Sequence, residues 1–227
     1  VENYVAKQRQ ADYSYSHIVN TSVALEKLSR YLGKPIKLGR PKKPKRLIKD
    51  TLTEGEIARM LAACKNSREQ AMLAVLIYTG LRNKELCNLK TNDINLGGMY
   101  ARIIDGKGRR DRLVYFTPEC AQILSEYKTE YKPNGQMFNT LVLKRSYNGW
   151  ALRKLVKVVA KRASIRKRVY PHLFRHSLAC NLLNRGANIL TIQAILGHAD
   201  IRTTMIYVHS TPTRIKQEYM FYNPSYL

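Results

Sequence analysis

The sequence predicts a mainly helical protein that contains one small antiparallel β-sheet. Apolar residues recur at helical spacing through most of the chain after residue 50. Residues 99–116 instead carry two short β-type runs on either side of a glycine-containing turn. A proline- and lysine-rich stretch, residues 39–46, interrupts the helical pattern and marks a boundary between two parts of the chain.

The segment before this boundary predicts one or two helices. Its apolar residues lie roughly on one helical face: Ile18, Val23, Leu25, Leu28 and Leu32. Such a segment is too short to form an independent domain, and the chain begins without Met. We therefore expect residues 1–38 to be the tail end of a larger helical domain, followed by an exposed basic linker over residues 39–49.

Helix-start and helix-stop signals recur after the linker. Thr53 and Glu56 have the spacing of a capping box, which predicts a helix through about Cys64. Ser67 can cap a second, almost wholly apolar helix that ends at Gly80. Further helices are expected over residues 82–89, 118–131, 150–163, 172–184, 189–196, 201–208 and 213–221.

A hairpin is predicted between the helices expected over residues 82–89 and 118–131. Residues 100–104 and 113–116 are the two β-type runs, and Asp105-Gly106-Lys107-Gly108 supplies the turn. Ile94 is a candidate for a third strand.

The charge of the chain indicates a polyanionic partner. Lys and Arg number 40 against 16 Asp and Glu, which gives a net charge of +24 and a pI near 10.1. Nucleic acid is the first candidate and an anionic membrane surface the second. The membrane is disfavoured because the longest apolar run, residues 71–78, is core-sized. We expect a cytoplasmic, DNA-associated protein.

The cysteines predict no metal site. The four are scattered and form neither a Cys-x-x-Cys pair nor a Cys/His cluster. Reduced thiols in a cytoplasmic protein are therefore expected, without a bound metal or other cofactor.

Several side chains could together cut a DNA backbone without a metal. That reaction needs a nucleophile, guanidinium groups to neutralise the phosphate oxygens, and groups that move protons. Arg82 follows a helix-ending glycine, at a helix start where a cation does not suit the helix dipole. Singly, each candidate also has an ordinary structural explanation. The candidates are Arg82, Lys107, His172, Arg175, His198 and Tyr207.

In order and spacing, five segments resemble the signature boxes of tyrosine recombinases, most closely of Xer-type and phage-integrase-like members. They are residues 79–86, 106–108, 172–176, 196–198 and 207–209. The resemblance spans roughly residues 50–210. It implies that residues 50–227 form the catalytic domain, with the DNA breaking-rejoining fold. Residues 1–38 would be the C-terminal part of a helical core DNA-binding domain, and residues 39–49 the linker.

The resemblance also implies catalytic roles. Tyr207 would be the nucleophile, forming a covalent bond to a DNA 3′-phosphate and releasing a 5′-hydroxyl. Arg82 and Arg175 would clamp the non-bridging oxygens of that phosphate. Lys107 would protonate the leaving 5′-oxygen. The resemblance implies neither a metal nor ATP nor another cofactor.

The histidines and one glutamate complete this assignment. His172 would handle the proton of the nucleophile, and its spacing from the second clamp arginine predicts that both lie on one helical face. His198 would hydrogen-bond the phosphate. Glu85, one turn after the first clamp arginine, is interpreted as a support that orients an arginine. His176 faces differently from His172 and is interpreted as structural.

Two basic segments are candidates for contacting double-stranded DNA. One is the linker, which prolines extend, and the other is the run after residue 153. Residues 177–208 resemble a helix-turn-helix, which we rank as a secondary reader of the major groove. The resemblance further implies a monomer in solution and a homotetramer on paired DNA sites. The candidate DNA-contacting residues are Arg40, Lys42, Lys43, Lys45, Arg46, Lys157, Lys161, Arg162, Arg166, Lys167 and Arg168.

Other functions compete with this interpretation. A type IB topoisomerase shares the chemistry but relaxes supercoils, and the Xer-like boxes favour recombination instead. A basic DNA-binding protein without catalysis is disfavoured because every predicted catalytic position carries a competent residue. An RNA-binding protein is disfavoured because no stacking-aromatic motif is found. Integration, excision, dimer resolution and inversion all remain open.

Overall fold

A computed structural model of the chain describes residues 15–39, 50–104, 111–140 and 147–197. The chain divides into two units, Val1–Lys49 and Asp50–Leu227. The division falls where the basic linker was predicted to end. Residues 40–49 of that linker lie outside the described residues, and the assignment of the first unit to a core-binding domain stays a prediction.

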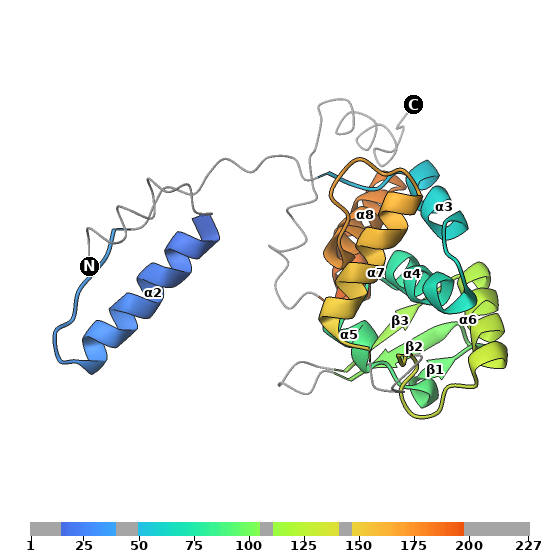
Figure 1. Ribbon diagram of the computed structural model, residues 1–227, viewed down its shortest axis with the longest axis horizontal. Helices are drawn as coiled ribbons and strands as arrows, with labels where there is room; N and C mark the ends of the chain where they lie inside the picture. The colour runs from blue at the N-terminus through green and yellow to red at the C-terminus, as the bar shows by residue number, and fades with distance from the viewer. Residues whose placement is uncertain (1–14, 40–49, 105–110, 141–146, 198–227) are drawn as a thin grey trace, which may run out of the picture. The chain divides into compact units, whose positions relative to one another are not determined.

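The described part of the first unit is one helix and the chain that returns along it. Helix α2 spans Tyr15–Tyr31, which confirms the predicted helix (Figure 1). Ile18 and Leu38 are buried against each other, with Leu25 packed beside them. The buried carboxylate of Glu26 accepts a hydrogen bond from the Leu38 N–H at 3.0 Å. This contact fixes the returning segment against the helix.

The second unit begins with two helices whose starts are set by side-chain caps. Helix α3 spans Glu54–Ala62, and the predicted capping box is confirmed: Thr53 Oγ1 accepts from the Glu56 N–H at 3.2 Å, and the Glu56 carboxylate accepts from the Thr53 N–H at 2.8 Å. Helix α4 spans Ser67–Thr79.

The predicted cap of α4 was wrong by one residue. Asn66, not Ser67, is the N-cap, and its side chain accepts from the Glu69 N–H at 2.9 Å. Ser67 is already helical, and its hydroxyl donates instead to the carboxylate of Glu130. The C-terminal end is as predicted: Gly80 takes a left-handed backbone conformation with φ +61°.

A three-stranded antiparallel sheet follows the short helix α5 (Asn83–Asn88) and a 3₁₀ turn at Thr91–Asp93. Its strands are β1 (Ile94–Asn95), β2 (Tyr100–Ile103) and β3 (Arg112–Tyr115), in the order β1-β2-β3. Ala101 pairs with Val114, and both are buried on the face turned towards the core. The predicted hairpin and third strand are confirmed, and the turn, residues 105–110, lies outside the described residues.

Four helices complete the described chain: α6 (Pro118–Tyr131), α7 (Gly149–Arg162), α8 (Pro171–Asn184) and α9 (Ile189–Leu196). Each matches a predicted helix within one residue at either end. The mainly helical fold with a small antiparallel sheet is therefore confirmed. The helices predicted over residues 201–208 and 213–221 lie outside the described residues.

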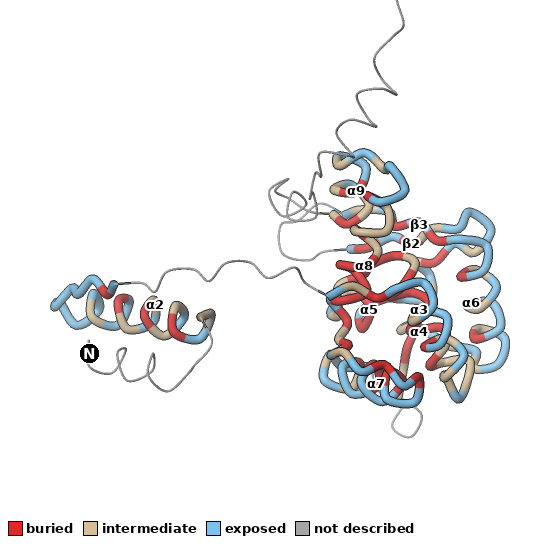
Figure 2. Tube along the Cα trace, turned by 90° about the horizontal axis from the view of Figure 1, so that it is seen from above, coloured by how far each residue is buried: buried red, intermediate tan, exposed pale blue. Residues whose placement is uncertain are grey.

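The core of the second unit is organised around α4. Residues 71–77 of this helix are all buried, so it is apolar on every side. Helices α6 and α7 lie outside it and expose their outer faces (Figure 2). A smaller apolar cluster joins α8 to α9 through Ala179, Leu183, Ile192 and Leu196. This cluster holds the C-terminal end of α9 near the end of α4.

Among the helices in the described part of the chain, none combines the length and apolar character that crossing a bilayer requires.

Candidate active site

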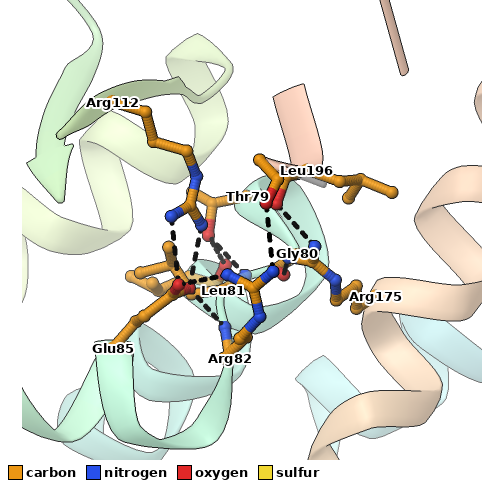
Figure 3. A network of polar contacts seen from close by, with 10 residues as sticks. Thr79, Gly80, Leu81, Arg82, Glu85, Arg112, Arg175 and Leu196 are labelled. Atoms are coloured by element: carbon orange, nitrogen blue, oxygen red, sulfur yellow. Dashed lines mark hydrogen bonds and ion pairs between the residues drawn. The ribbon is translucent and has the colours of Figure 1, made fainter. Parts of the chain in front are cut away.

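The first candidate arginine lies where the chain leaves α4 and enters α5. After Gly80 and the buried Leu81, Arg82 takes an extended backbone conformation as the N-cap residue of α5. The Glu85 carboxylate accepts from the Arg82 backbone N–H at 2.8 Å and from Arg82 Nη1 at 2.6 Å (Figure 3). The predicted contact between Glu85 and an arginine is therefore present, and it fixes the Arg82 guanidinium near the start of the helix.

A second arginine binds the same carboxylate. Arg112, on β3, donates from Nη1 to Glu85 Oε1 at 3.0 Å and from Nη2 to Glu85 Oε2 at 2.8 Å. Burial by itself would raise the pKa of Glu85, but the hydrogen bonds and charges of Arg112 and Arg82 outweigh it and lower that pKa to about 2. Glu85 is therefore ionised at neutral pH.

The other candidate clamp residue, Arg175, is inside the protein. It lies in α8, and only 1% of its surface is exposed. Its Nη1 donates to the carbonyl oxygen of Gly80 at 2.9 Å, and its Nη2 donates to the carbonyl oxygen of Leu196. Carbonyls at helix C-termini lack partners within their own helix and carry partial negative charge. Arg175 thus satisfies the ends of both α4 and α9.

The residue after α9 brings these arginines to one place. The carbonyl oxygen of Gly197 accepts from Arg82 Nη2 at 3.1 Å. Gly197 has φ +62°, and a Cβ there would lie 2.5 Å from Cδ of Arg112. The close approach therefore requires glycine both for its backbone conformation and for its lack of a side chain. Arg82, Arg112 and Arg175 converge on the C-terminal end of α9 (Figure 3).

The predicted catalytic residues are only partly within the described chain. Arg82 and Arg175 are far apart in sequence and meet at the end of α9. His172 and Arg175 were predicted to lie on one face of the same helix. In the structure His172 is exposed in the first turn of α8, whereas Arg175 is buried. His176 is buried, consistent with a structural side chain. Lys107, His198 and Tyr207 lie outside the described residues.

Arg112 is a site residue that the sequence analysis missed. It is two residues before Val114 in β3, so both side chains point to the same face of the strand, and Val114 is fully buried. A cation on the apolar face of a strand requires a partner. The position of Arg112 on the buried face of the strand was the signal in the sequence that it needs a partner. No local spacing rule identifies that partner as Glu85 on α5.

The basic segment that includes α7 divides into two kinds of cation. Arg162 Nη1 lies 2.6 Å from Glu69 Oε2, and Lys167 Nζ lies 2.8 Å from Glu56 Oε2. Lys167 also donates to the carbonyl oxygen of Thr51. Arg162 is exposed despite its ion pair, and the other four candidates in this segment are exposed as well: Lys157, Lys161, Arg166 and Arg168. The linker candidates lie outside the described residues: Arg40, Lys42, Lys43, Lys45 and Arg46.

The electrostatics of the site favour an anion. Arg82, Arg112 and Arg175 carry three positive charges, and Glu85 carries one negative charge, which leaves two net positive charges around the end of α9. Arg82 is the most exposed of the arginines that bind Glu85, with 28% of its side chain accessible against 12% for Arg112. Forked guanidinium donors of this kind suit the oxygens of a phosphate group.

The chain belongs to the phage integrase family, whose model matches residues 50–214. The resemblance to tyrosine recombinases drawn from the sequence is thereby confirmed. A tyrosine recombinase of Pseudothermotoga lettingae is 34% identical over 178 residues, covering 77% of this chain. The chain spans only 61% of the length of that curated relative.

Two solved structures share the fold. The crystal structure of XerA recombinase is 31% identical, with a TM-score of 0.70, over 99% of this chain and 82% of the other. The Tn1549 transposon integrase, solved in complex with transposon right end DNA, has a TM-score of 0.80 at 17% identity, over 98% of this chain and 84% of the other. At that identity the second likeness is one of fold alone.

Proposed function

We propose that this chain is a site-specific DNA recombinase that cuts and rejoins strands through a covalent bond between Tyr207 and a DNA 3′-phosphate. The observation that carries the proposal is the convergence of Arg82 and Arg175 on the end of α9, directly before position 198. Membership of the phage integrase family and the likeness to XerA recombinase support strand exchange as the outcome. The net charge of +24 and the Tn1549 integrase–DNA complex support double-stranded DNA as the partner.

The cleavage step uses side chains alone. The hydroxyl oxygen of Tyr207 attacks the phosphorus, a bond forms between them, and the bond to the 5′-oxygen breaks. His172 takes the proton from Tyr207, and Lys107 gives a proton to the departing 5′-oxygen. A 5′-hydroxyl of another strand then attacks the phosphotyrosine in the reverse step. The phosphotyrosine conserves the bond energy, so the cycle does not consume ATP.

The remaining residues stabilise the phosphate as negative charge builds on its oxygens. Arg82 and Arg175 neutralise the non-bridging oxygens, and His198 donates a further hydrogen bond. Arg82 is accessible to a phosphate as it stands. Arg175 is buried, and its two terminal nitrogens each donate one bond to a helix-end carbonyl. A guanidinium has five N–H groups, so donation to a phosphate oxygen does not require the loss of these two bonds.

The DNA backbone is proposed to follow the exposed cations Lys157, Lys161, Arg166 and Arg168, together with the basic linker. Arg162 and Lys167 are left out of this surface because each is bound to a carboxylate within the fold. The chain is proposed to be a monomer in solution and to assemble as a homotetramer on paired sites.

The test is capture of a protein–DNA adduct that survives denaturant. Duplex fragments from the source genome, nicked so that a cleaved 5′-hydroxyl piece diffuses away, are incubated with the wild type, Tyr207→Phe and Tyr115→Phe. Tyr115 is exposed on β3 and serves as a matched control. An adduct in the wild type and Tyr115→Phe that is absent in Tyr207→Phe supports the proposal.

The other outcomes separate the competing functions. An adduct that persists in Tyr207→Phe identifies another tyrosine as the nucleophile. Adduct formation with relaxation of supercoils but no strand exchange indicates a type IB topoisomerase. Salt-sensitive DNA binding without any adduct indicates a DNA-binding protein without catalysis.

A further inference from the structure

We infer that Arg112 is a positioning residue for the phosphate site: it neutralises Glu85, so that Arg82 keeps its positive charge available to a phosphate group. This inference rests on the proposed role of Arg82. It assigns Arg112 no contact with DNA and no part in proton transfer.

The hydrogen bonds define a three-membered chain of charges. Both carboxylate oxygens of Glu85 accept hydrogen bonds from Arg112, at 3.0 and 2.8 Å, in the forked geometry that an arginine offers a carboxylate. The Oε1 atom of Glu85 also accepts from Arg82 Nη1 at 2.6 Å. Only 12% of the Arg112 side chain and 8% of the Glu85 side chain are exposed. Arg82 is therefore the member that faces an incoming anion.

The charge balance of these three residues gives Arg112 its function. A carboxylate 2.6 Å from Arg82 cancels most of the attraction that Arg82 exerts on a phosphate, and itself repels the phosphate. With Arg112 the three residues sum to one positive charge, and without it they sum to zero. Because the pKa of Glu85 is lowered to about 2, this balance holds across the neutral pH range.

A second contact places Arg112 under the end of α9. Its Cδ and Nε atoms occupy the space where a side chain of Gly197 would lie, and the carbonyl of Gly197 accepts from Arg82. Strand β3, which carries Arg112, packs beside α9. One arginine thus fixes the Arg82–Glu85 pair and also supports the turn that leads to position 198.

A merely structural arginine would give the same contacts, so the test separates charge from packing. Arg112→Met removes the charge and keeps much of the length. The double variant Glu85→Gln/Arg112→Met removes two packed ionic groups but restores the net charge of +1. Packing alone predicts that the double variant is worse than the single one. Neutralisation predicts that it recovers.

Two readouts are used on each folded protein. The first is the single-turnover rate of adduct formation with the DNA fragments that the wild type captures. The second needs no DNA: the saturating part of the rise in Tm as sodium sulfate replaces sodium chloride at equal ionic strength. An oxyanion bound at the site saturates, whereas the general stabilisation of proteins by sulfate does not. We expect Arg112→Met to lose at least about tenfold in rate and most of the sulfate response. We expect the double variant to regain most of both.

A matched control and a milder variant protect the interpretation. Arg185 and Glu54 form another ion pair, at 2.6 Å on the surface, so Arg185→Met and Glu54→Gln/Arg185→Met should leave both readouts at the wild-type level. Arg112→Lys keeps the charge without the forked geometry, and we expect it to retain more activity than Arg112→Met. It also tests the inference if Arg112→Met does not fold.

The outcomes distinguish this inference from the proposed function. If Arg112→Met reacts like the wild type, or the double variant recovers neither readout, or Arg112→Lys is as impaired as Arg112→Met, the inference is wrong and the recombinase function stands. If the wild type forms no adduct, the proposed function fails, and the sulfate response alone decides whether Arg112 maintains an anion site.

Discussion

The two candidate clamp arginines are held in opposite ways. Arg82 is partly exposed and is held mainly by side chains, through Glu85 and, behind it, Arg112. Arg175 is almost fully buried and is held by backbone carbonyls, those of Gly80 and Leu196. One guanidinium therefore depends on a balance of charges, and the other is part of the framework that joins α4, α8 and α9.

This difference separates function from stability within one site. A change at Arg82 alters the charge presented to a ligand while the helices stay in contact. A change at Arg175 leaves two helix C-terminal carbonyls without their donor inside the protein. Although both residues are arginines in the same proposed role, substitution of Arg175 should therefore lower the free energy of unfolding much more than substitution of Arg82.

The largest effect is expected for Arg175→Met. Leaving the carbonyls of Gly80 and Leu196 without this donor should lower the free energy of unfolding by about 2 to 6 kcal/mol. Arg82→Met should lower it by about 1 kcal/mol or less, because its ion pair is partly exposed. Urea unfolding of both variants measures the contrast. Equal losses would show that the two arginines are not held differently.

The next effect is a pH dependence carried by Glu85. Its pKa in the folded protein, about 2, lies below its ordinary value of 4.5. Stability from this carboxylate is therefore fully present above about pH 4.5 and is lost as the pH falls towards 2, by about 3 kcal/mol in total. Urea midpoints of the wild type and Glu85→Gln, measured from pH 5 to pH 2, should converge as the pH falls. A constant difference between the two proteins would contradict the assignment.

The framework of the site could largely be predicted from the sequence, because it depends on local signals. The Thr53–Glu56 capping box, the left-handed Gly80 and the hairpin between β2 and β3 all arise from residues a few positions apart. Arg82 and Arg175 were identified from the order of the segments that resemble the tyrosine recombinase signature boxes. The missed cap at Asn66 is also local, since Asn and Ser both favour that position and stand side by side.

What could not be predicted depends on contacts between distant segments. The bond of Arg112 to Glu85 joins β3 to α5, and those of Arg175 join α8 to the ends of α4 and α9. Neither follows from a spacing rule. The burial of Arg175 was likewise not evident, since a lone arginine is usually at the surface.

A smaller effect is expected at Gly197, which lies against Arg82 and Arg112. Gly197→Ala combines a positive φ with displacement of Arg112, and should cost about 2 to 3 kcal/mol of stability. Gly186 also has a positive φ, +88°, but a Cβ there meets nothing within 4 Å. Gly186→Ala should therefore cost about 1 kcal/mol, which isolates the backbone contribution. If thermal unfolding gives equal losses, the contact with Arg112 contributes nothing.

The smallest effect extends the same contrast to the basic segment. Lys157 is exposed on α7, whereas Lys167 binds the carboxylate of Glu56 and the carbonyl of Thr51. Lys157→Met should leave stability within about 0.5 kcal/mol and should reduce the slope of log K against log salt for duplex DNA by about one. Lys167→Met should lower stability by about 1 kcal/mol and leave the slope unchanged. DNA-binding titrations at several salt concentrations, with urea unfolding of the same proteins, measure both quantities.

The contrast fails if Lys167→Met changes the slope as much as Lys157→Met does. In that case a cation bound within the fold also contacts the DNA backbone. Ion pairing inside the protein then does not distinguish the cations that contact DNA from those that do not.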